Sequence, residues 1–127
     1  MDYVYIVIVI AMIEYSVMIL VVGATRVKFG VLPPEVKGNQ TWDRLYRIQV
    51  NTAEQLVLFI PSLLLFATTV SPLWAARLGC VFLVGRIVYA LTYLRDPRTR
   101  IPGAILSSFT SYFFVLGSAV ALVKGIL

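Results

Sequence analysis

Three polar residues on one helical stripe give the strongest chemical signal in the chain. Arg47, Asn51 and Glu54 are spaced i, i+4, i+7, so a helix would place them on one face. The segment that they open becomes apolar from Leu56. Charged side chains in or near a bilayer are costly and usually have a buried partner or a ligand. The stripe therefore predicts a polar pocket between helices, whereas Arg44 or Arg47 alone would be an interfacial anchor.

A second polar set lies about forty residues further along the chain. Arg86, Tyr89 and Tyr93 are spaced i, i+3, i+7, and Arg100 follows Tyr93 by seven residues. Neighbouring antiparallel helices would bring this set to the same end of the molecule as the stripe. The result would be a basic cleft, rich in hydrogen-bonding groups, with one carboxylate. Such a cleft suits a small anionic ligand that carries one ammonium group, because arginine binds carboxylates in a bidentate manner and Glu54 would hold the amine.

The composition shows which elements must position these residues. The chain has 127 residues, of which 60% are hydrophobic and only 13% are charged, and a helix that crosses a bilayer needs about 20 mostly apolar residues. We therefore expect an all-α integral membrane protein, a four-helix bundle that forms a single domain over residues 1–127. The expected spans are Tyr3–Ala24, Tyr46–Val70, Leu73–Leu94 and Pro102–Val123.

Charge and residue types limit the chemistry further. The net charge of +5 comes from arginines and lysines that gather in the first and third connections, so it indicates a cytosolic location for those connections rather than nucleic-acid binding. The chain has no histidine and one cysteine, and no metal site is expected. Cys80 is expected to be inert core, and Asp43 is expected to cap the second helix.

The polar sets resemble a known family. Arg44-x-x-Arg47-x-x-x-Asn51-x-x-Glu54, followed by an apolar run that contains proline, is similar to the second-helix signature of the MAPEG family, the membrane-associated proteins of eicosanoid and glutathione metabolism. Residues 82–93 resemble the third helix of that family, and Arg100 falls where the family has its catalytic arginine. The likeness covers all four spans and the long first loop.

The resemblance implies a homotrimer that binds glutathione, as co-substrate, in clefts between subunits near the cytosolic face. The implied enzyme is a glutathione transferase, with or without peroxidase activity, in a bacterial inner membrane or the endoplasmic reticulum. It would form the glutathione thiolate for attack on lipophilic electrophiles or hydroperoxides. By residue-for-residue match, Arg100 would be catalytic, and glutathione would be held by Arg26, Arg47, Asn51, Glu54, Tyr89 and Tyr93, with Gln49 and Arg86 as supporting members.

Two alternatives stay open at this point. Glu14 is a lone carboxylate in the middle of the first span, and such a residue in a four-helix protein of this size resembles that of small proton-coupled multidrug exporters. The excess of arginine suits an anionic ligand better than a cationic drug. Separately, Glu54 would serve a structural role if it formed an ion pair with Arg86 or with an arginine of a neighbouring subunit.

Overall fold

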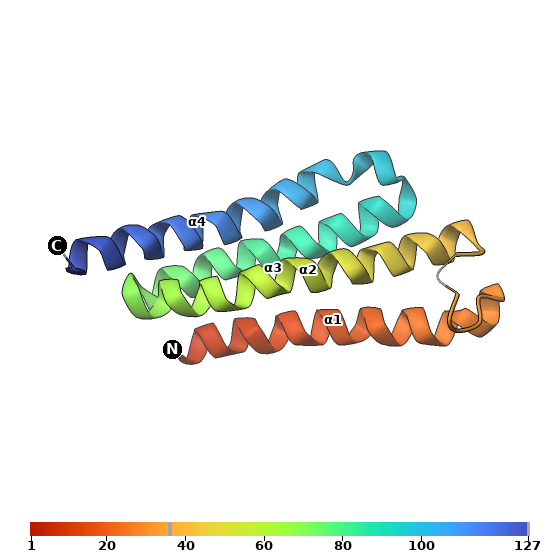
Figure 1. Ribbon diagram of the computed structural model, residues 1–127, viewed down its shortest axis with the longest axis horizontal. Coiled ribbons are helices and arrows are strands. Elements are labelled where there is room, and N and C mark those ends of the chain that lie inside the picture. Colours follow the sequence, from red (N-terminus) through yellow and green to blue (C-terminus); the bar gives the residue numbers. More distant parts are fainter. Residues whose placement is uncertain (36, 127) are drawn as a thin grey trace.

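The structure is a computed structural model that describes residues 1–35 and 37–126. It contains four long α-helices and one short 3₁₀ helix (Figure 1). The helices are α1 (Asp2–Phe29), α2 (Gln40–Thr69), α3 (Pro72–Arg95), η1 (Pro97–Thr99) and α4 (Ile101–Ile126).

The predicted fold class is confirmed. The four α-helices have 28, 30, 24 and 26 residues, and each is long and apolar enough to cross a membrane. No strand occurs in the described ranges. The chain is therefore an integral, multi-pass membrane protein.

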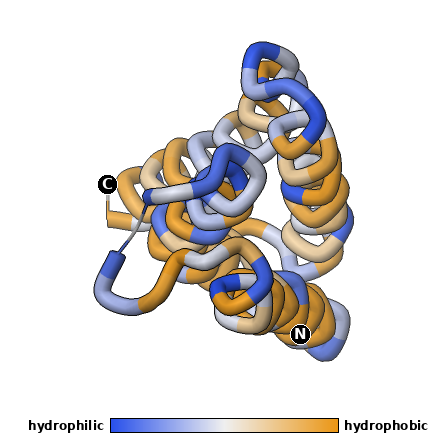
Figure 2. The backbone as a smooth tube through the Cα atoms, turned by 90° about the vertical axis from the view of Figure 1, so that its right-hand side faces the viewer, coloured by the Kyte–Doolittle hydropathy of each residue, from blue (hydrophilic) through white to orange (hydrophobic). Residues whose placement is uncertain are grey.

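The helices alternate in direction, so the two polar sets meet at one end of the bundle. Both termini and the α2–α3 turn lie at one end, while the α1–α2 and α3–α4 connections lie at the other (Figure 1). In the end-on view of Figure 2, hydrophilic residues gather in the connections and apolar residues follow the helices. We call the end that carries the two longer connections the loop end.

Aromatic side chains hold the middle of the bundle together. The ring of Phe59 in α2 stacks on that of Phe82 in α3, with the two ring centroids 3.7 Å apart. Phe114 of α4 contacts the same cluster, with its centroid 6.2 Å from that of Phe59. All three are fully buried, so this cluster fixes how α2, α3 and α4 face one another.

Two local expectations were wrong. Asn39, and not Asp43, caps α2: its side-chain oxygen accepts a hydrogen bond of 3.1 Å from the backbone N–H of Trp42. The helix thus begins one turn earlier than expected, and Asp43 lies in its first turn, where a negative charge is favourable. Cys80 is exposed on α3 rather than buried in the core, because an apolar helix in a membrane also presents apolar residues to lipid.

Candidate functional site

The predicted stripe lies on α2, which is helical throughout residues 40–69. Arg47 and Glu54 are exposed, and Asn51 between them is half-buried. The Asn51 Oδ1 atom is buried and has no hydrogen-bond partner among the described residues. A buried acceptor without a partner costs free energy, so this atom is a candidate for binding an N–H group of a ligand.

The third-helix set packs as a column of stacked side chains. The guanidinium of Arg86 lies over the ring of Tyr89, 4.3 Å from its centroid. The rings of Tyr89 and Tyr93 stack with their centroids 5.5 Å apart. Arg86 is 1% exposed and Tyr89 is 5% exposed, while Tyr93 is half-buried. The column therefore runs from the interior of the bundle towards the loop end.

Close packing of α3 against α4 brings Arg100 to this column. A Cβ atom at Gly103 would collide with the backbone N and Cα atoms of Tyr89, so only glycine allows this approach. The carbonyl of Arg100 accepts the first hydrogen bond of α4, from the N–H of Ala104 at 3.0 Å. Arg100 lies three residues before this contact, and its side chain is exposed.

Three of the predicted site residues lie on neighbouring elements: Glu54 on α2, Tyr89 on α3 and Arg100 directly before α4. The sole salt bridge in the described part of the chain joins Arg98 to Asp96, at 3.2 Å. Glu54 therefore forms no ion pair with Arg86 within the described subunit and stays available to a ligand.

Arg86 is buried in the interior of the bundle. Its Nη2 atom donates a hydrogen bond of 2.7 Å to the hydroxyl of Thr52. Its Nε and Nη1 atoms are buried and have no partner among the described residues. Thr52, 1% exposed, was not singled out in the sequence, because a threonine in an apolar helix usually bonds its own backbone.

Two other predicted residues, Arg26 and Gln49, lie off the stripe of Arg47, Asn51 and Glu54. Arg26 donates hydrogen bonds from Nη1 to the carbonyls of Val31 (3.3 Å) and Glu35 (2.7 Å), and its guanidinium lies 4.6 Å from the ring centroid of Trp42. Gln49 is two residues after Arg47 in α2, which at about 100° per residue puts it on nearly the opposite face of the helix. A single subunit does not bring Arg26 and Gln49 to the ligand-facing stripe.

Arg44, the first residue of the recognised signature, has a local structural role. Its Nη1 atom donates hydrogen bonds to the carbonyls of Leu94 (3.0 Å) and Arg95 (3.2 Å). These are terminal carbonyls of α3, which lack partners inside their own helix. Arg44 thus ties the first turns of α2 to the end of α3.

The fold defines the class of protein: a four-helix membrane protein whose predicted polar residues lie on α2, on α3 and directly before α4. The sequence model of the MAPEG family matches residues 4–120. The chain belongs to the MAPEG family, as its signature predicted.

Individual relatives agree with this membership. The chain is 43% identical over 108 residues to an uncharacterized protein from Synechocystis, covering 85% of this chain and 79% of that protein. It is 34% identical over 94 residues to human microsomal glutathione S-transferase 2, covering 74% of this chain and 64% of the transferase. It is 31% identical over 103 residues to bovine leukotriene C4 synthase, covering 81% and 69%. The match thus spans a little less than two thirds of the length of the human transferase.

Proposed function

We propose that this protein is a membrane-bound glutathione transferase, with the capacity to reduce lipophilic hydroperoxides. The observation that carries the proposal is the close packing of Gly103 against the backbone of Tyr89, which brings the start of α4, after Arg100, to the column of Arg86, Tyr89 and Tyr93. The relatives named as glutathione transferases support the same class of activity.

Glutathione fits the donors and acceptors of the cleft. It has two carboxylates, one ammonium group, amide N–H groups and a thiol. Arg47 is an exposed guanidinium suited to a carboxylate, and Glu54, one turn beyond Asn51, is suited to the ammonium group. The buried Oδ1 atom of Asn51 would accept from a ligand N–H group. Tyr93, which stacks on Tyr89 and is half-buried, would offer its phenolic hydroxyl.

Arg100 would supply the activation. A free thiol has a pKa of about 8.5 and is a poor nucleophile when protonated. A guanidinium beside the sulfur stabilises the thiolate and leaves the neutral thiol unaffected. Lowering the thiol pKa by ~2 units corresponds to about 2.7 kcal/mol of such stabilisation. The thiolate would then attack an electrophile that arrives from the bilayer, or the peroxide oxygen of a lipid hydroperoxide.

A cleft shared between subunits would give Arg26 and Gln49 their roles. Gln49 faces away from the stripe of its own helix, and Arg26 lies in the last turn of α1 beside Trp42, not on the stripe. In a homotrimer these two side chains would face the glutathione of a neighbouring subunit. We propose this assembly, with the loop end in the cytosol because its connections are basic, in a bacterial inner membrane or the endoplasmic reticulum.

The ultraviolet difference spectrum on adding glutathione to the purified protein tests this function. A thiolate band near neutral pH is expected in the wild type, absent in Arg100→Ala and weakened in Glu54→Gln. Arg98→Ala is the matched control, because Arg98 is exposed in the same connection but pairs with Asp96. A thiolate band and turnover that both survive in Arg100→Ala and Glu54→Gln would show that the cleft is assigned wrongly.

A further inference from the structure

A partly open cavity lies between helices of the subunit, apart from the residues proposed to bind glutathione. Its volume is about 410 Å³, and it opens between α1, α2 and α3. None of the residues proposed for glutathione lines it. Its walls are apolar except for one carboxylate, and they include Glu14, Met18, Val22, Leu45, Ile87 and Leu94.

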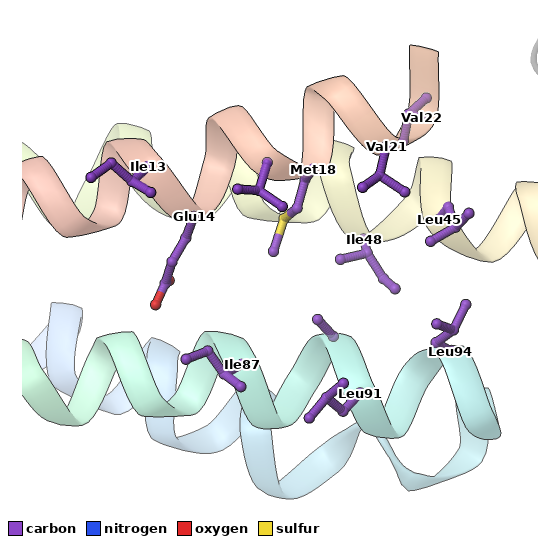
Figure 3. A pocket seen from close by; sticks show the side chains of 12 residues that line it. Ile13, Glu14, Met18, Val21, Val22, Leu45, Ile48, Ile87, Leu91 and Leu94 are labelled. Atoms are coloured by element: carbon purple, nitrogen blue, oxygen red, sulfur yellow. The ribbon is translucent and has the colours of Figure 1, made fainter. Parts of the chain in front are cut away.

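Glu14 is directed into this cavity. Figure 3 shows its side chain extending from α1 towards α3, on the side where Ile87 lies. The carboxylate is half-buried, and no hydrogen bond or salt bridge joins it to another described residue. Glu14 is the sole ionisable residue among those lining the cavity. An ionisable side chain at this depth in a membrane calls for a partner.

Arg86 does not supply that partner directly. It is near enough to attract Glu14 electrostatically, but its Nη2 atom is bonded to Thr52 and its plane is stacked on Tyr89. The two charged groups are not within salt-bridge distance. The Glu14 carboxylate thus remains free to bind a group that enters the cavity.

We propose that this cavity binds a lipophilic amine, with its ammonium group on Glu14 and its hydrocarbon part against the apolar walls. The volume lies within the range of about 300–1,000 Å³ that small-molecule sites occupy. A single carboxylate at an otherwise apolar wall is complementary to a molecule with one cation and a hydrocarbon body. An acyl chain of a lipid would fill the volume but would leave Glu14 without a partner.

Paired probes test this site. The full-length protein in detergent micelles is equilibrated with isotope-labelled N,N-dimethyloctylamine or with its uncharged counterpart 2-methyldecane, and binding to empty micelles is subtracted. We expect the amine to bind more tightly than the hydrocarbon. Glu14→Gln should weaken amine binding about tenfold, which corresponds to about 1.4 kcal/mol, and should leave hydrocarbon binding unchanged.

Two further variants separate charge from shape. Asp2→Asn removes a carboxylate from the exposed first turn of the same helix and should leave both probes unaffected. Ala90→Leu narrows the cavity from α3 and should weaken both. The thiolate spectrum with glutathione, which needs no cavity residue, reports whether each variant is folded and whether the first site works. Equal binding of amine and hydrocarbon, amine binding that Glu14→Gln does not change, or no binding of either probe would overturn the proposal.

Discussion

Loss of the hydrogen bond between Arg86 and Thr52 should lower the free energy of unfolding markedly, although the side chain at position 52 would hardly change in shape. Thr52→Val replaces one hydroxyl by a methyl group at a position that is 1% exposed. It removes the one hydrogen bond that Arg86 makes to a described residue, at 2.7 Å. Nε and Nη1 already lack partners there, so the substitution would leave a buried guanidinium with none.

Two measured ranges bracket the expected loss in the free energy of unfolding. Hydrogen bonds to charged groups contribute about 1.5–3 kcal/mol, whereas interhelical hydrogen bonds within membranes average about 0.6 kcal/mol because the unfolded state also finds partners. The value for charged groups applies here, because the Arg86 guanidinium is buried away from water and has no ready substitute for its hydrogen bond to Thr52. We therefore expect Thr52→Val to lower the free energy of unfolding by about 2 kcal/mol.

Reversible unfolding by sodium dodecyl sulfate in mixed micelles measures this loss. Thr52→Ser keeps the hydroxyl and should retain most of the stability. Thr110→Val makes the same chemical change at another buried threonine, whose hydroxyl donates only to the Leu106 carbonyl of its own helix, at 2.7 Å. If Thr52→Val cost no more than Thr110→Val, the guanidinium would have another partner, and the account of Arg86 given above would be refuted.

Three further substitutions test side-chain and backbone contacts near the loop end. Gly103→Ala should push α4 away from Tyr89, destabilise the protein by about 1–3 kcal/mol as other overpacked contacts do and weaken the thiolate band of glutathione. Arg44→Ala should cost about 1 kcal/mol in the same unfolding assay, because two carbonyls of α3 lose their donor. Hydrogen bonds from Arg98 lower the pKa of Asp96, so Arg98→Ala should raise that pKa in a carboxyl NMR titration. The small contribution of this pair to folding stability is present above about pH 3.9. It is lost as the pH falls through the lowered pKa of Asp96.

The sequence predicted the helices and the faces of the polar residues, because both depend on short-range regularities. Four apolar runs predict four spans, and the period of 3.6 residues places Arg47, Asn51 and Glu54 on one stripe. The same regularity applied to Arg86, Tyr89 and Tyr93, and the structure shows them stacked. Their shared glutathione site remains a prediction until it is measured.

Contacts between helices could not be predicted from the sequence as well as the helices themselves. Lipid-facing and core-facing residues are both apolar in a membrane helix, so the rotation of α1 about its axis is not encoded in its hydropathy. For this reason the cavity at Glu14 could not be anticipated, and Cys80 was assigned to the wrong side of α3. Hydrogen bonds such as those of Arg44 to the end of α3 depend on side-chain reach across about fifty residues of sequence.

One side chain links the two proposed sites, although they share no lining residue. Arg86 stacks on Tyr89 at the cleft and lies within electrostatic reach of Glu14 at the cavity. An ammonium group bound to Glu14 would offset the attraction that Glu14 exerts on Arg86, and the guanidinium would then depend more heavily on Thr52. The destabilisation by Thr52→Val should therefore be larger when N,N-dimethyloctylamine is bound than when 2-methyldecane is bound. An equal loss with both probes would show that Arg86 does not connect the cavity to the cleft.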